Sequence, residues 1–151
     1  MSTTPNPAPV PEVVTQDERT YATLAHALQV IGGWIAPLVI FLLQSRSKFV
    51  RFHALQALFF QLGVLIFWVV FVMLWFTMMF AGIFASIAQQ GSHPGSPPVA
   101  VFFLFPMIWL LGLGMWVTVL VVAVLYAVRA GRGEWAEYPV IGKWVRHILH
   151  I

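Results

Sequence analysis

Histidine and glutamine side chains inside long apolar stretches are the residues of this sequence best able to do chemistry. Five such residues and one glycine are the candidate positions, three on each of two stretches: His26, Gln29 and Gly33, then His53, Gln56 and Gln61. In each set the spacing of three, four, seven or eight residues places the members on one side of a helix. Polar groups in an apolar setting either hydrogen-bond between helices or bind a ligand. We favour interhelical hydrogen bonding and keep ligand binding as the alternative.

The two histidines decide which cofactors the sequence could hold. A tetrapyrrole or a lipid could lie near His26 or His53, and no other cofactor is expected. If each apolar stretch crosses a membrane once, the two rings lie at opposite faces, roughly 25 to 30 Å apart. A metal needs ligands about 2 Å from one ion, so a metal site shared by the two histidines is not expected.

Catalytic patterns are absent from the sequence. It contains no cysteine, no His/Glu metal motif, no Gly-rich phosphate loop and no Ser-His-Asp set. We therefore predict that the protein is not an enzyme. Aromatic residues are abundant, with Trp68, Phe71 and Trp75 in a helical stripe and Phe102, Phe103 and Phe105 in a cluster. Packing and membrane-interface belts explain such residues, and a pigment or lipid site is the alternative.

The composition indicates which solvent surrounds these residues. Hydrophobic residues make up 60% of the 151 and charged residues 9%, whereas a soluble domain carries about 25% charged residues. A soluble chain of this size could not bury so much apolar surface. The net charge is +3, but the basic residues flank apolar segments instead of forming a nucleic-acid-binding patch. We expect a lipid bilayer and other membrane-protein subunits as partners, and no nucleic acid.

Three apolar stretches without charge predict an all-α integral membrane bundle of about three transmembrane helices. They cover residues 22–43, 54–88 and 99–128. The first would span about 33 Å, enough for a bilayer core of about 30 Å. Glycines and Pro37 inside it are tolerated in membrane helices, and Pro37 predicts a bend. The second stretch, at about 52 Å as one helix, is longer than one span needs.

The remaining segments complete the domain division. Residues 1–15 form a Pro-rich tail predicted to be disordered, and residues 16–138 the transmembrane domain. Thr15 and Glu18 fit a capping box, which predicts a helix start. Residues 89–98 predict a loop, and residues 129–138 a polar turn.

Residues 139–151 predict an amphipathic helix lying on the membrane surface. Apolar residues, with Trp144 among them, gather on one side, and Lys143 and Arg146 lie on the other. These three are the candidate membrane-interface residues. Packing of this helix on a partner protein is the alternative.

The distribution of Lys and Arg predicts the orientation. The segment 44–52 and the C-terminal segment are basic, whereas the loop 89–98 has no charge. Three spans then place the N-terminus outside and the C-terminus in the cytoplasm. The predicted location is the bacterial inner membrane, crossed several times.

Four segments together resemble a known family. They are Glu18-Arg19 with Leu24 to Leu28, Gly32 to Pro37, His53 to Gln61, and Ala130 to Trp135 with Tyr138-Pro139. Their order and spacing resemble the bacterial membrane proteins related to the twenty-kilodalton Tic subunit of the chloroplast inner-envelope import machinery. The resemblance covers about residues 17 to 142. It implies a helical membrane module, no catalytic residues and, in the plastid branch, a role in protein translocation.

The function predicted from these observations is that of a non-catalytic accessory or structural subunit of a larger membrane complex. Small and polar helix faces suited to protein contacts and an overlong apolar stretch support this interpretation. A membrane subunit that binds a pigment, quinone or lipid is one alternative. A Tic-like component of a protein translocation pathway is the other.

Overall fold

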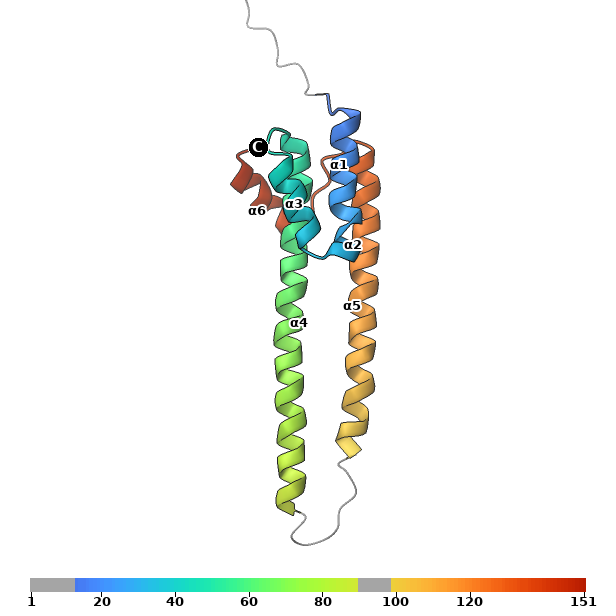
Figure 1. The fold of residues 1–151 in the computed structure, drawn as a ribbon, viewed down its shortest axis with the longest axis vertical. Helices are drawn as coiled ribbons and strands as arrows, with labels where there is room; N and C mark the ends of the chain where they lie inside the picture. Colours follow the sequence, from blue (N-terminus) through green and yellow to red (C-terminus); the bar gives the residue numbers. More distant parts are fainter. Residues whose placement is uncertain (1–12, 90–98) are drawn as a thin grey trace, which may run out of the picture.

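The computed structural model describes the backbone of residues 13–89 and 99–151, and the side chains of 13–88 and 106–151. Every regular element in these ranges is a helix, in agreement with the predicted all-α class (Figure 1). Most of the predicted tail and of the loop 89–98, and the side chains of Phe102, Phe103 and Phe105, lie outside the described residues.

The first helix, α1 (Gln16–Ala27), begins as predicted. The hydroxyl of Thr15 accepts a hydrogen bond from the Glu18 backbone N–H, and the Glu18 carboxylate accepts one from the Thr15 backbone N–H. The same carboxylate also accepts a hydrogen bond of 2.7 Å from the hydroxyl of Ser47. Ser47 in turn caps the next long helix by accepting from the Val50 N–H. The cap therefore ties two helix starts together.

The prediction of one continuous helix over residues 22–43 is wrong. The chain forms α1, a single turn α2 (Gln29–Gly32) and α3 (Ile35–Leu43), and α3 runs back beside the start of α1 (Figure 1). The reversal occurs at Gly33, whose φ of +54° is a conformation that residues with a Cβ rarely adopt. Pro37 lies in the first turn of α3, where its missing N–H costs little, so it does not bend a span.

Two long helices, α4 (Lys48–Gln89) and α5 (Val99–Gly131), run antiparallel and extend far beyond the others (Figure 1). At 1.5 Å per residue they measure about 63 Å and 50 Å. These are the two described helices long and apolar enough to cross a membrane, so three spans are not confirmed. We call residues 63–89 of α4 and 99–118 of α5 the shaft. We call everything else that the structure describes the head.

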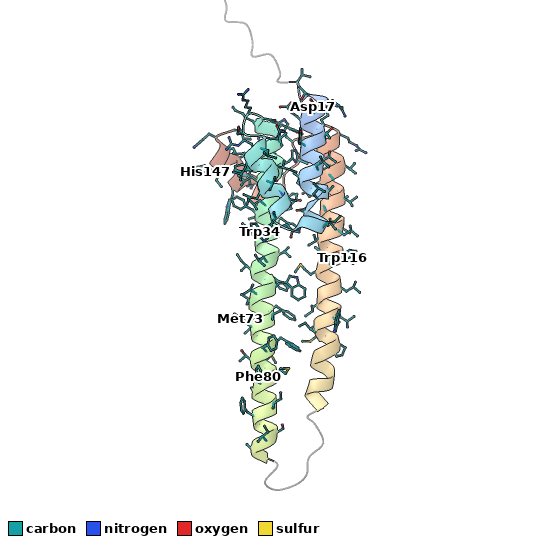
Figure 2. All side chains as sticks on the ribbon, in the orientation of Figure 1. Asp17, Trp34, Met73, Phe80, Trp116 and His147 are labelled. Atoms are coloured by element: carbon teal, nitrogen blue, oxygen red, sulfur yellow. The ribbon has the colours of Figure 1, made fainter. Side chains whose placement is uncertain are left out.

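The head contains the buried core. Small residues let the helices approach closely, as where Ala25 and Ala54 pack with Ile40 and Val50. A second cluster joins Phe52, Leu55 and Leu58 of α4 to Val145 of the C-terminal helix. In the shaft, large side chains such as Met73 and Phe80 point away from the molecule (Figure 2), and both are at least half exposed.

The C-terminal region packs across α4. Residues 132–140 leave α5 without regular structure and lead to α6 (Ile141–Leu149), which is a helix as predicted. Its start lies against the preceding segment, since a Cβ on Gly142 would lie 2.7 Å from the Cβ of Glu137. Val145 is fully buried against α4.

The reversal at Gly33 also changes which ends of the molecule lie together. The start of α1, the turn 44–47 and α6 all lie at the head end, whereas the shaft points the other way (Figure 1). The predicted arrangement, with the N-terminal residues opposite the C-terminus, required the first stretch to cross. It turns back instead, so the predicted separation is wrong for the described part of the chain.

Candidate functional site

A continuous chain of buried hydrogen bonds runs through the head. His26 Nε2 lies 3.0 Å from His53 Nδ1, and His26 Nδ1 lies 3.0 Å from the hydroxyl of Tyr138. At one end, His53 Nε2 lies 3.1 Å from the backbone oxygen of Glu134. At the other end, the Gln29 amide nitrogen lies 3.5 Å from the Tyr138 hydroxyl. Both imidazole rings are completely buried.

The proton positions in this chain follow from its one fixed end. A backbone carbonyl can only accept, so His53 Nε2 must carry a hydrogen and His53 Nδ1 must accept. His26 Nε2 then donates to His53, and the Tyr138 hydroxyl donates to His26 Nδ1. Both histidines are neutral in this arrangement, and all four ring nitrogens are used.

Two further glutamine side chains form hydrogen bonds with backbone groups next to this network. Gln56 accepts from the Tyr138 backbone N–H at 2.6 Å and donates to the Ala136 backbone oxygen at 3.2 Å. Gln61 donates to the backbone oxygen of Gln29 at 2.9 Å. The irregular segment 134–138 and the turn α2 are thus held by α4 side chains. Satisfied backbone is what allows irregular structure next to an apolar solvent.

Burial sets the charge state of the groups outside the long helices. Burial, together with the neighbouring His53, lowers the pKa of His26 well below its ordinary value. Burial raises the pKa of the Tyr138 hydroxyl above its ordinary value. Both groups are therefore neutral at physiological pH, as the hydrogen-bond directions require.

The prediction that His26 and His53 lie at opposite membrane faces is wrong, because the reversal at Gly33 keeps His26 at the head end. Their proximity still does not assemble a metal site. Within the described side chains, no group of three or more His, Cys, Asp or Glu residues could hold a metal ion. A tetrapyrrole bound to either histidine would have to displace one of the hydrogen bonds above, which the ring nitrogens fully occupy.

Two cavities lie below this network, between the long helices. One, of about 370 Å³, is lined by Gln29, Gly33 and Gln61 together with apolar residues of α4 and α5. The oxygen of the Gln29 side chain is buried there without a hydrogen-bond partner. The second, of about 500 Å³, lies in the shaft and is almost wholly apolar, and four tryptophans line it: Trp68, Trp75, Trp109 and Trp116.

The structure places the predicted polar residues of the apolar stretches together and the predicted membrane-interface residues of the C-terminal helix apart from them. His26, Gln29, His53 and Gln56 form the network, and Gln61 joins it through backbone. Gly33 supplies the turn instead of a helix contact. The three predicted interface residues, Lys143, Trp144 and Arg146, lie apart from the network on α6. Trp144 is 67% exposed, and Arg146 forms an ion pair with Glu137.

Sequence reasoning missed the tyrosines that complete the site. Tyr138 donates to His26, and the Tyr126 ring lies 3.9 Å from the Tyr138 ring, centroid to centroid. Tyr126 also donates to the backbone oxygen of Glu137 at 2.9 Å. The available signal was a polar segment with one tyrosine inside it and another shortly before it, at the end of an apolar stretch.

Comparison with known proteins gives one match. Residues 17–145 match the family MamF/MmsF, described as the magnetosome magnetite crystal formation protein family. No curated protein matches the chain, and no solved structure does. The match overturns the resemblance to the Tic subunit, because it covers the same segments and assigns them to a different family, and no comparison relates the chain to the Tic subunit.

Proposed function

This chain belongs to the magnetosome magnetite crystal formation protein family, and from that premise we propose that it is a non-catalytic accessory protein of the magnetosome membrane. In this role it supports crystal formation by assembling with other proteins in that membrane. The single observation that carries the proposal is the family match over residues 17–145. Two apolar helices, each long enough to cross a bilayer, support the membrane location.

The geometry of the head supports a structural and not a catalytic use of its polar residues. Each imidazole nitrogen already has a hydrogen-bond partner within the chain. A general base or metal ligand needs a lone pair available to a substrate or ion. The network instead fixes α1, α4 and the segment 134–138 relative to one another.

The shaft supports assembly with other membrane proteins. Its two helices expose large apolar side chains along their length, and the shaft part of α4, about 40 Å long, is longer than a bilayer core of about 30 Å. Apolar helix surface beyond the hydrocarbon region needs cover from protein.

The charge distribution supports one orientation. All eight Lys and Arg residues lie at or before residue 51 or at or after residue 129, in segments that meet at the head end. We propose that the head end faces the cytoplasm and that residues 90–98 lie on the other side of the membrane, with two spans.

Cysteine labelling tests this orientation, because the chain has no cysteine of its own. Single substitutions Asp17→Cys, Ser45→Cys and Ser92→Cys would be treated with an impermeant thiol reagent on intact and opened vesicles. Two spans require Asp17→Cys and Ser45→Cys to react from the same side and Ser92→Cys from the other. If Asp17→Cys reacts together with Ser92→Cys, the first stretch crosses and the two-span arrangement is incorrect.

Deletion of the gene in a magnetosome-forming host tests the function itself. We expect crystals altered in size or number, restored by the wild-type gene. A photo-crosslinker at Met73 in the shaft should yield adducts with other magnetosome membrane proteins, whereas one at Asp17 serves as the matched head position. Unaltered crystals would reject the role in crystal formation, and a chain that forms no adduct in the membrane would reject the assembly role.

A lipid-binding role is the second candidate, favoured by the apolar cavity of about 500 Å³ in the shaft. Its tryptophan lining suits an acyl or isoprenoid chain. Mass spectrometry of the gently purified protein would detect a retained lipid, and Gly112→Leu should abolish retention because Gly112 lines that cavity. Leu111→Phe, on the same helix but not in the lining of either cavity, is the control.

A further inference from the structure

The helix α6 presents three different sides to its surroundings. One side packs on α4 through three residues: Ile141, Val145 and Leu149. A second side is an exposed apolar stripe at intervals of four residues: Val140, which immediately precedes the helix, then Trp144 and Ile148. These are 68%, 67% and 50% exposed. A third side is basic and polar, and carries Lys143, Arg146 and His150.

The directions of these sides follow from helix geometry. At 3.6 residues per turn, the centre of the apolar stripe lies roughly 100° from the α4-facing side and roughly 130° from the basic side. A helix held against a membrane-spanning helix can therefore point its stripe toward the hydrocarbon and its basic side toward the headgroups and water. The packing on α4 fixes this rotation, because Val145 is fully buried.

We propose that α6 anchors the head to an anionic lipid leaflet, with the Trp144 stripe in the acyl region and the basic side among the phosphate groups. Charge complementarity selects this occupant. All eight Lys and Arg and all five Asp and Glu of the chain lie in the segments that lead to the head end, so the net charge of +3 is concentrated there. His147 projects outward from α6 at this head end of the molecule (Figure 2).

Neighbouring contacts keep the basic side in place. The Arg146 guanidinium forms an ion pair with Glu137 and lies over the Phe52 ring, 5.4 Å from its centroid. Lys143 is exposed on the same side. Lys143 is therefore the residue whose charge is most available to a headgroup, and Arg146 is partly neutralised within the chain.

The test places a fluorescent thiol label on the full-length protein in nanodiscs. Ile148→Cys carries the label on the stripe, and His150→Cys carries it on the basic side of the same helix. The lipids are phosphatidylcholine alone or mixed with phosphatidylglycerol, with bromine on the acyl chains as a contact quencher. We expect severalfold stronger quenching at position 148 than at 150, and an increase with the phosphatidylglycerol fraction.

Charge and apolar contributions are separated by two further variants. Because one basic side chain near an anionic surface contributes on the order of 1 kcal/mol, Lys143→Gln should weaken the preference for phosphatidylglycerol about fivefold. Trp144→Glu should strongly reduce the quenching at position 148, whereas His150→Glu, which adds the same charge on the other side, should leave most of it. Unchanged thermal unfolding of the rest of the protein confirms that the variants fold.

Three results would overturn the proposal. Equal quenching at 148 and 150 would mean that the stripe does not enter lipid. Quenching that does not change with the phosphatidylglycerol fraction would contradict the proposed preference for anionic lipids. A label at 148 that is shielded from water but unquenched by brominated chains would assign the stripe to a second protein surface.

Discussion

The head and the shaft of this protein differ in sequence and in how they are held together, because every described charged residue lies in the head and none in the shaft. In the head, buried His26, His53 and Gln56 exchange hydrogen bonds with each other and with irregular backbone. In the shaft, side chains such as Met73 and Phe84 are 65% and 68% exposed. The head is therefore specified by contacts inside the chain, and the shaft by what surrounds it. Substitutions should be costly in the first and tolerated in the second.

Removal of His53 should have the largest effect on this comparison. His53→Leu leaves the His26 N–H and the Glu134 carbonyl buried without partners, and each such group costs about 1 to 3 kcal/mol. We expect a loss of roughly 3 kcal/mol in the free energy of unfolding, measured by thermal or denaturant unfolding in detergent. His150→Leu is the matched control on the surface and should change little. Equal stability of the two variants would show that the network does not hold the head.

Two glycines give the next largest contrast. A Cβ on Gly142 in the head would lie 2.7 Å from Glu137 Cβ and 3.1 Å from its Cα, so backbone must move. A Cβ on Gly112 in the shaft would lie 3.1 Å from the far end of the Trp68 ring, which can turn away. We expect Gly142→Ala to cost about 2 kcal/mol. Gly112→Ala should be neutral or stabilising by up to about 1 kcal/mol, because alanine favours a helix.

The same unfolding measurement checks both glycines. A cost at Gly112 as large as that at Gly142 would mean that the shaft helices are packed as tightly as the head, and the contrast between the two regions would be lost.

Acid should weaken the head by a smaller amount. His26 is held neutral, with its pKa lowered by burial and by His53, whereas in the unfolded chain its pKa is about 6.5. The unfolded state then binds a proton more readily, so stability is fully present above about pH 6.5 and declines as the pH falls below it. At about pH 5.5 one such histidine costs about 1 kcal/mol.

Unfolding midpoints compared at about pH 7.5 and 5.5 measure this loss. His26→Gln should flatten the dependence, whereas replacing the exposed His147 and His150 by glutamine should leave it intact. If the pH dependence of the unfolding midpoint is lost when His147 and His150 are replaced, the acid sensitivity comes from the surface of α6 and not from His26.

Much of the head could be predicted from local patterns, and its assembly could not. The capping box at Thr15 and the amphipathic helix near Trp144 depend on neighbours a few residues away, and both helices form as expected. The reversal at Gly33 was not foreseen, because glycine in an apolar stretch is compatible with a membrane helix as well as with a turn. Hydropathy does not distinguish the two.

Because of this one reversal, the hydrogen-bond network between His26, His53 and Tyr138 could not be predicted from the sequence. A membrane span over residues 22–43 would place His26 far from His53, so the contact between them, and the contact with residues 134–138, is not expected from that arrangement. The polar residues that spacing groups on each stretch, His26, Gln29, His53 and Gln56, are all buried. The spacing of residues along one helix does not indicate which other helix its polar side contacts.

The return of the chain at Gly33 also bears on how the protein enters a membrane during synthesis. Residues 52–128 contain no charged side chain, and both ends of this segment lie at the head end. With two spans, insertion moves only the shaft end of this uncharged segment into and across the bilayer, and α1 to α3 remain with the head part of α4 on the side where the ribosome releases them. No lysine, arginine, aspartate or glutamate has to be dehydrated on the way, which removes the largest barrier to insertion. The polar network can then close after the hairpin is in place, from residues that never leave that side.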